Sequence, residues 1–337
     1  MADDAATVTA RPENDVATGP AAAARGKPMV LSFDVEEHHR IEAASGLSID
    51  PRLKADYGDR MRKVTEWLLG ELAERKILAT FFVLGQIAEA LPKMVRAIAE
   101  AGHEVASHGW DHRRIHLMDR DGFREDVRRS KDALEQASGS LVAGYRAPTF
   151  SVVRRTAWAV DVLAEAGLLY DSSIYPVRHD RYGVPDAPRN PFLVRGMERE
   201  ILEIPPATLR LGGVNLPIGG GGYFRLLPYP VTRSALALAR RDEDCVGTML
   251  YFHPWEFDPG QPVLPLKALS RLRTYVGVGR GRRRLAALMS SHSFIRGVDL
   301  ARLQFERRAD LPRFSLGAGA DRGPEEAGPS RARIEQA

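Results

Sequence analysis

The stretch "MVLSFDVE" (residues 29–36) combines an apolar run with acidic residues at its end, a pattern typical of a buried strand with a polar C-terminal end. Successive side chains of a strand point to opposite faces. Asp34 and Glu36 therefore share one face, and Glu37 falls on the other. The stretch predicts a strand that presents a pair of carboxylates at its end.

Apolar runs alternate with helix-like stretches after this strand. The expected strands are residues 78–85, 103–109, 141–148, 168–173 and 245–253. The expected helices are residues 59–76, 91–102, 119–139, 154–167 and 229–244. Repeated βα units predict an α/β fold with a mainly parallel sheet, which places its chemistry at the C-terminal ends of the strands.

The composition limits the kinds of site that the chain can build. Its 337 residues are 44% hydrophobic and 27% charged, as in ordinary soluble globular proteins. Cys245 is the only cysteine, which excludes an intramolecular disulfide and a cysteine-based zinc site, so a bound metal would need His, Asp or Glu. The net charge of +4 is too small to favour nucleic acid as a partner.

Both ends of the sequence lack the composition of a packed core. Residues 1–27 are acidic near the start and have no signal-peptide pattern, and residues 315–337 are rich in Gly, Pro, Ala and charged residues. We expect two disordered tails around one domain of residues 28–295. No apolar run reaches the ~18 to 20 residues that span a bilayer, so we expect a location in the cytoplasm or at the periphery of the inner membrane.

The second half of the domain has weaker patterning. Residues 174–196 contain too many prolines for regular structure and are expected to form a long loop. Residues 200–295 then decorate the end of the same domain. Within them, "IGGGGYF" (218–224) lacks the Gly-Lys-Ser/Thr of a phosphate loop and predicts a flexible or close-packed loop.

Three further motifs follow expected strands. In "SHGWDH" (107–112), His108 and His112 are four residues apart, so a turn can direct both imidazoles to one point. With a carboxylate from the first strand they form the 2-His-1-carboxylate set of catalytic divalent metals. In "YRAPTF" (145–150) and "YFHPWEF" (251–257), Arg146 and His253 end strands before a proline. Taken alone, each of these residues also fits a core position or a surface ion pair.

These motifs, in this order, resemble the polysaccharide deacetylases with a NodB-homology domain, carbohydrate esterase family 4, over residues 28–295. The branch linked to exopolysaccharide loci of exosortase (PEP-CTERM) systems is the most similar, because its members carry a C-terminal extension like residues 204–228. The resemblance implies a distorted (β/α) barrel of the NodB-homology type. It also implies removal of N-acetyl groups from a glycan with a divalent metal, usually Zn²⁺.

The resemblance further implies a role for each motif residue. Asp34 would be the general base, and the metal ligands would be Glu36, His108 and His112. Arg146 would hold Asp34 ionised, His253 would be the general acid, and the backbone N–H of Thr149 would contribute to the oxyanion site. Many family members have two adjacent aspartates where this chain has Asp-Val-Glu. The aspartate that usually tunes the general acid has no clear counterpart, and Asp171 is a candidate for a supporting role.

Some interpretations stay open at this stage. Trp255 is either a core residue or part of a pocket for the acetyl methyl group, and His38 is a further candidate ligand on the face of Asp34. The basic segment 271–285 would contact a membrane or anionic polysaccharide, or simply face water. Two other functions remain: a metal-dependent amidase acting on a small cyclic or linear amide, and a degenerate carbohydrate-binding scaffold.

Overall fold

The computed structural model describes residues 29–179, 182–241 and 247–317. Its core is a ten-stranded sheet in the order β10-β1-β2-β3-β4-β5-β7-β6-β12, with β11 paired to β1. Neighbouring strands are parallel except for β6 and β7. The strands of this sheet are β1 (Met29–Val35), β2 (Thr80–Val83), β3 (Glu104–Ser107), β4 (Gly144–Tyr145), β5 (Tyr170–Asp171), β6 (Phe192–Arg195), β7 (Glu200–Glu203), β10 (Thr248–Phe252), β11 (Phe294–Ile295) and β12 (Arg313–Ser315).

The sheet closes on itself through the chain that follows β7. Pro206 forms a parallel bridge with Met249, and Gly220 forms one with Tyr251, so this segment reaches β10 at the other end of the strand order. Between the two bridges lies a separate hairpin of β8 (Thr208–Leu211) and β9 (Val214–Pro217). Closure by single bridges rather than by a full strand makes a distorted barrel, which confirms the expected fold class.

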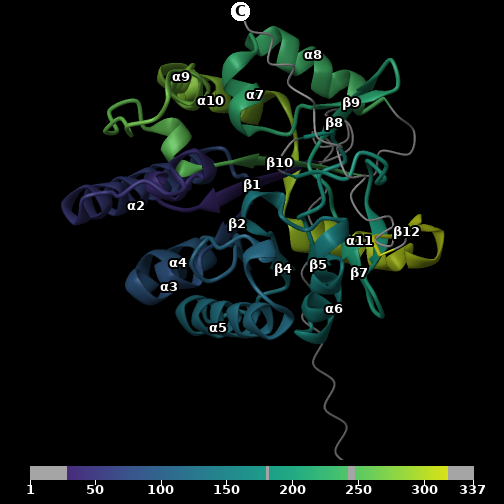
Figure 1. Cartoon of the computed structure of the whole chain (residues 1–337). Helices are drawn as coiled ribbons and strands as arrows, with labels where there is room; N and C mark the ends of the chain where they lie inside the picture. Colours follow the sequence, from purple (N-terminus) through teal and green to yellow (C-terminus); the bar gives the residue numbers. More distant parts are fainter. Residues whose placement is uncertain (1–28, 180–181, 242–246, 318–337) are drawn as a thin grey trace, which may run out of the picture.

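Helices follow most of the parallel strands and cover the sheet. They are α2 (Pro51–Glu74), α3 (Gly85–Ala90), α4 (Pro92–Glu100), α5 (Arg120–Ser138), α6 (Trp158–Glu165), α7 (Gly221–Leu226), α8 (Tyr229–Ala239), α9 (Ala268–Tyr275), α10 (Gly281–Ser291) and α11 (Gly297–Glu306). The helices α7 to α10 gather at one end of the molecule, and α5 and α6 lie at the opposite end (Figure 1). No helix within the described ranges is both long and apolar enough to cross a bilayer.

The first two long helices show how local signals set their bounds. Helix α2 starts earlier than its apolar periodicity indicates, because the Asp50 side chain accepts a hydrogen bond from the Arg52 N–H and Pro51 occupies the first turn. Helix α5 begins after Asp119, which caps the Gly122 N–H, and ends at Gly139, whose φ of 73° is left-handed. The buried faces of both helices belong to the main hydrophobic core.

Two predictions about the second half of the chain were partly wrong. Residues 192–195, expected in a loop, form β6, and the prolines lie before this strand rather than within it. The glycine run was expected to be a flexible or close-packed loop; residues 218–220 lie outside the named helices and strands, but residues 221–226 form α7. Gly220 lies so close to β10 that an added Cβ would collide with the carbonyl oxygen of Tyr251, so only glycine fits there.

The chain remains folded up to the last described residue. Helix α11 and strand β12 follow residue 295, and Leu316 is buried. The expected C-terminal tail therefore starts too early, since β12 ends at Ser315 and pairs with β6. Residues 318–337, like residues 1–28, lie outside the described residues.

Candidate metal and catalytic site

The predicted polar residues meet at the C-terminal ends of adjacent parallel strands. Asp34 lies near the end of β1 and Glu36 just after it, His108 follows β3, Arg146 follows β4, and His253 follows β10. Strand β1 lies between β10 and β2 in the sheet, so its carboxylates stand at the centre of this edge.

Glu36, His108 and His112 form the cluster expected to hold a metal ion. The Nε2 atom of His112 lies 2.6 Å from Glu36 Oε2, and that of His108 lies 3.9 Å from the same oxygen. One ligand atom from each residue lies within 4.8 Å of the other two. His112 has a φ of 67°, a strained value for a non-glycine residue that is common at functional sites. The structure thus brings the three predicted ligands together.

The chemistry of these three side chains fits a divalent ion. His108 Nδ1 lies 2.9 Å from the carbonyl oxygen of Arg146, which can only accept, so Nδ1 carries the proton and Nε2 keeps a free lone pair. Burial lowers the pKa of His108 to about 4, which keeps the ring neutral. Glu36 Oε2 is buried, and His112 Nε2, although only 2.6 Å away, is not aligned to donate a hydrogen bond to it. Two imidazole nitrogens and one carboxylate match the ligand set of catalytic zinc.

Arg146 fixes the position of Asp34. Its guanidinium is fully buried, and Nη1 donates to Asp34 Oδ1 at 2.5 Å and to Ser32 Oγ at 2.9 Å. Nη2 donates to Ser172 Oγ at 3.0 Å, and the group lies 4.0 Å from the ring centroid of Phe82. A buried arginine held on several sides cannot move away from its carboxylate. Asp34 is therefore oriented with Oδ2 left for the site.

His253 lies on the opposite side of the carboxylates from the histidine pair. Its Nε2 is 3.9 Å from Asp34 Oδ2 and 3.7 Å from Glu36 Oε1, and its side chain is 18% exposed, enough to meet a substrate. Its Nδ1 lies 2.8 Å from Glu256 Oε1. Burial opposes the charged ring, but the Glu256 hydrogen bond and the nearby carboxylates outweigh it and raise the pKa of His253 to about 9.

Glu256 is the functional residue that the sequence analysis missed. It follows His253 by three residues in the 3₁₀ turn Pro254–Phe257, which folds its carboxylate back onto the imidazole. Its Oε2 accepts from Arg225 Nε at 2.7 Å, so an arginine of α7 holds the carboxylate in place. The sequence signal for this contact is His-Pro-x-Glu, because a proline after the histidine favours a turn that brings the glutamate back to the imidazole.

A Glu256→Gln variant tests this pairing. Loss of the carboxylate charge is expected to lower the pKa of His253 toward its ordinary value, so less of the ring is protonated at alkaline pH. On the alkaline side of the pH profile, activity of the wild type should fall as the pH rises through about 9. The variant should lose activity at lower pH, with kcat at pH 8 reduced roughly tenfold. A pH profile of kcat that is unchanged in the variant would contradict the pairing.

Asp171 does not contact His253 but belongs to a second buried acidic pair. It lies opposite Glu203 in the register of β5 and β7, and both side chains are completely buried. Its Oδ1 accepts hydrogen bonds from the Ser172 N–H and the Ser173 hydroxyl. Ser173 in turn accepts from the Ala147 N–H at 2.7 Å. Through Ser173 the pair supports the backbone next to Arg146 and does not reach His253, so the supporting role expected of Asp171 stays a prediction.

Burial makes this pair hold a proton at neutral pH. It raises the pKa of Asp171 to about 7 and that of Glu203 well above its usual range, because two adjacent buried carboxylates cannot both ionise easily. A carboxyl group whose pKa is higher in the folded than in the unfolded state lowers the stability of the fold as the pH rises, because the unfolded state releases the proton first. The stability of the wild type should therefore fall as the pH rises above the ordinary carboxyl range toward 7 and beyond.

A Glu203→Gln variant should reduce this dependence, because the amide supplies a hydrogen-bond donor without a titrating proton. We expect the free energy of unfolding of the variant, relative to the wild type, to improve by about 1 kcal/mol per pH unit over this range. Chemical denaturation at a series of pH values measures the difference. Parallel curves for the two proteins would show that the pair does not retain a proton.

Thr149 and Trp255 occupy positions beside the site. Thr149 and Phe150 have φ values of 57° and 49° directly after Pro148, a strained turn next to Arg146. The Trp255 ring is stacked at 5.3 Å and 24° on His253. Trp255 is also a buried member of the cluster of Ile41, Tyr57 and Leu264, so it is a core residue that borders His253.

His38 is a packing residue in this structure. Its Nε2 lies 2.8 Å from the Tyr275 hydroxyl, and its ring lies 4.8 Å from the Trp255 ring. It is not part of the cluster of potential ligands found in the described ranges. Glu37 points away from the cluster and pairs with Arg40.

Two adjoining grooves extend from the site along the surface. One, of about 410 Å³, includes His112 in its wall, and the other, of about 610 Å³, reaches the space between α2 and α3. They share the polar side chains of His39, Arg40 and Lys54, so the two grooves adjoin there.

Comparison with known proteins agrees with this geometry. A family model described as polysaccharide deacetylase matches residues 52–170, and a model for a domain of unknown function (DUF3473) matches residues 172–302. A peptidoglycan-N-acetylglucosamine deacetylase of Bacillus cereus is 28% identical over 29% of this chain and 36% of its own length. A chitooligosaccharide deacetylase of Rhizobium leguminosarum is 30% identical over 30% of this chain and 45% of its own length. The chain thus spans less than half of these curated relatives.

Solved structures share the fold over a larger part of the chain. A Mycobacterium smegmatis protein assigned to the polysaccharide deacetylases has a TM-score of 0.55 and 24% identity, with 86% of this chain and 94% of that one covered. The allantoinase PuuE has a TM-score of 0.53 and 18% identity, with 82% and 89% covered. These likenesses concern the barrel, whereas the family match concerns the segment that carries the histidine pair. Residues 52–170 of this chain are thus similar to the polysaccharide deacetylases.

Proposed function

We propose that this chain is a metal-dependent hydrolase that removes N-acetyl groups from an N-acetylated glycan, with Zn²⁺ as its metal. The observation that carries the proposal is the meeting of Glu36, His108 and His112 beside two proton-transfer groups, Asp34 and His253. A binding scaffold needs no such groups, so their positions favour catalysis. The names of the curated relatives support N-acetylated sugars as the substrate class.

The side chains would divide the reaction between two proton transfers. Bound at Glu36, His108 and His112, the metal would lower the pKa of a water molecule and polarise the acetyl carbonyl. Asp34 Oδ2 would remove the proton of the attacking water, while Arg146 holds Oδ1 in place. His253, kept protonated by Glu256, would give its proton to the sugar nitrogen as the C–N bond breaks. The products are acetate and a free amine on the sugar.

The backbone between Arg146 and Phe150 would complete the site. The left-handed turn at Thr149 is rigid because Ser173 holds the Ala147 N–H on one side and Pro148 restricts the chain on the other. We assign the Thr149 N–H to the oxyanion that develops on the acetyl carbonyl. Trp255, stacked on His253, would line the space for the acetyl methyl group.

The two adjoining grooves beside His112 support an extended substrate over a small cyclic amide. Their shared walls are polar, with Arg40 and Lys54 among them, and hydroxyl-rich sugars bind such surfaces through hydrogen bonds. The likeness of residues 204–228 to the exopolysaccharide branch leads us to place the reaction in exopolysaccharide biosynthesis.

Acetate release tests the proposal directly. The full chain, loaded with Zn²⁺, should release acetate from oligomers of N-acetylglucosamine, and excess chelator should abolish the reaction until the metal is restored. Activity that rises with oligomer length would agree with the grooves. Hydrolysis of ureide-type cyclic amides alone would instead establish an amidase, and binding of oligomers without any acetate release would establish a carbohydrate-binding scaffold.

A further inference from the structure

One end of the molecule carries a strong charge that the catalytic site does not use. Residues 260–291, which include α9 and α10, contain no Asp or Glu. Their charged residues are Lys267, Arg271, Arg273, Arg280, Arg282, Arg283 and Arg284. The helices α7 to α10 together form this end of the molecule (Figure 1), and we call their outer surface the α7–α10 face. It falls within the region matched by the domain of unknown function.

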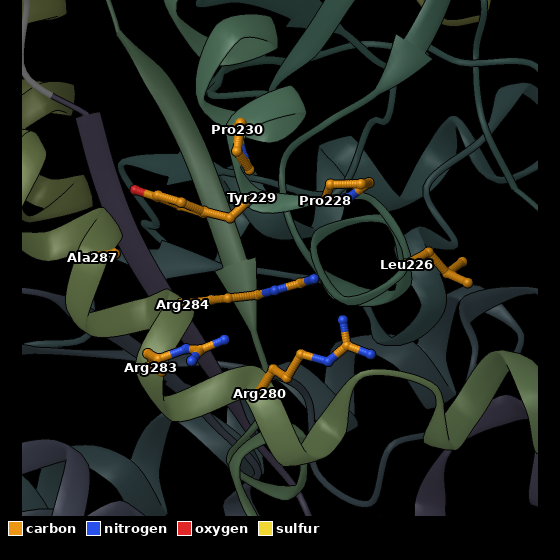
Figure 2. Close-up of a pocket in the computed structure, with 8 residues that line it drawn as sticks. All are labelled: Leu226, Pro228, Tyr229, Pro230, Arg280, Arg283, Arg284 and Ala287. Atoms are coloured by element: carbon orange, nitrogen blue, oxygen red, sulfur yellow. The ribbon is translucent and has the colours of Figure 1, made fainter.

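A pocket of about 440 Å³ lies at the centre of the α7–α10 face. Its lining residues are Leu226, Pro228, Tyr229, Pro230, Arg280, Arg283, Arg284 and Ala287. Figure 2 shows the guanidinium groups of Arg280 and Arg284 extending toward the segment that carries Leu226 and Pro228. One side of the pocket is therefore cationic and the other is apolar.

Within the described ranges, the arginines of this pocket lack an acidic counterpart. Arg284 is buried, and its Nη1 donates to the carbonyl oxygens of Phe224 at 2.7 Å and Arg225 at 2.8 Å, which fixes the group without neutralising it. No carboxylate of the described residues lies within ion-pair distance of Arg280, Arg283 or Arg284. Three neighbouring positive charges with no counterion provide a site for an anionic group.

The opposite end of the molecule provides a contrast. On α5, Arg124 pairs with Asp121 and Glu165, and Arg128 pairs with Glu125 and Asp132. These two arginines are exposed, but the carboxylates next to them neutralise the charge of each one. Among the described residues, the uncompensated charge of the three pocket arginines is thus a local property and not a general feature of this mildly basic chain.

Exposed apolar side chains accompany the cationic pocket. Leu226 is 47% exposed at the pocket rim, and Val231 and Leu238, seven residues apart on one side of α8, are 49% and 48% exposed. On α9, Leu269 and Leu272 are 59% and 60% exposed. In the sequence they alternate with the basic residues Lys267, Arg271 and Arg273. A soluble polyanion would use the charges alone. An anionic bilayer surface would use both the charges and the apolar side chains.

We propose that the α7–α10 face docks on the surface of a lipid bilayer that contains anionic phospholipid. A lipid phosphate would bind Arg280, Arg283 and Arg284, and the leucines of α7 and α9 would enter the interface. Docking would be peripheral and reversible, because short exposed segments and a few charges give only moderate membrane affinity. The inference does not depend on the proposed reaction, since it uses none of the catalytic residues.

Vesicle flotation of the full chain tests the docking. The protein should bind vesicles of phosphatidylcholine mixed with phosphatidylglycerol, bind vesicles of phosphatidylcholine alone weakly, and dissociate as salt is raised. The double variant Arg280→Gln/Arg283→Gln should bind the anionic vesicles about 30-fold more weakly. The variant Leu269→Ser/Leu272→Ser, which keeps every charge, should lose about tenfold. The matched control Arg124→Gln/Arg128→Gln removes the same charge from α5 and should bind like the wild type.

Two results would overturn the proposal. Equal weakening by the control and by Arg280→Gln/Arg283→Gln would mean that only total charge matters. Unchanged binding in Leu269→Ser/Leu272→Ser, together with full displacement by the soluble polyanion dextran sulfate, would identify a site for soluble polyanions instead. Thermal unfolding of each variant establishes that it is folded, and vesicle binding by chelator-treated protein separates docking from the proposed deacetylase activity.

Discussion

Asp34→Asn is expected to retain the divalent ion and to lower kcat by about 10²- to 10⁴-fold, the usual contribution of a general base. The amide is nearly the same size as the carboxylate, and its oxygen can still accept from Arg146 Nη1 where Oδ1 does now. Its nitrogen would then stand at the position of Oδ2, near His253 Nε2. That nitrogen cannot take a proton from water, so geometry is kept and proton transfer is lost.

The measurements for this variant are acetate release and metal content per chain. Asp132→Asn is a matched control, because it makes the same change in an exposed side chain of α5 that pairs with Arg128 away from the cluster. The control should retain activity within about twofold of the wild type, as expected for a surface ion pair. Near-normal kcat in Asp34→Asn would show that another group is the base, and loss of its metal would make Asp34 a ligand.

The sequence was sufficient for the parts of the site that depend on strand ends. Alternation along β1 separated Asp34 from Glu37, and the four-residue spacing of His108 and His112 placed both near one carboxylate. These inferences worked because a parallel sheet brings its strand ends to one edge, whatever the exact strand lengths are. Even β4 and β5, which are each only two residues long, deliver their polar residues to this edge.

The same short strands show where sequence patterns failed. The expected strand 141–148 ends in the structure at Tyr145, because Arg146 turns inward and the Ala147 N–H bonds to the Ser173 side chain instead of a neighbouring strand. The pairing of Asp171 with Glu203 depends on the register of β5 and β7, which are joined by a long irregular segment. The two-residue period of a strand and the 3.6-residue period of a helix contain no information about contacts between segments far apart in the sequence.

Glu256 was missed for a different reason. Its contact with His253 is local, but its own support comes from Arg225 in α7, a helix that begins within a run of glycines. Glycine-rich segments carry no helical periodicity, so the sequence gives no signal that an arginine there would reach the site.

Removal of either histidine ligand should have the second large effect. His108→Ala and His112→Ala are each expected to reduce bound Zn²⁺ from about one ion per chain to a small fraction and to lower kcat/KM by at least about 10³-fold, since the metal contributes several kcal/mol to the transition state. The two variants should differ in how much they destabilise the folded state. His108 is buried and bonded to the Arg146 carbonyl, whereas His112 is 10% exposed in a strained turn.

A thermal shift separates loss of the metal from loss of the fold. Zn²⁺ binds the native state, so adding it should raise the melting temperature of the wild type and leave both alanine variants unchanged. His116→Ala is the matched control, because this half-buried histidine lies four residues beyond His112 and outside the cluster, and its variant should still respond to Zn²⁺. If His112→Ala kept a full stabilisation by Zn²⁺, the ion would be held elsewhere and Glu36 would lose its assigned role. If all three variants failed to respond, the cluster would depend on the whole segment 108–116 and not on the two imidazoles.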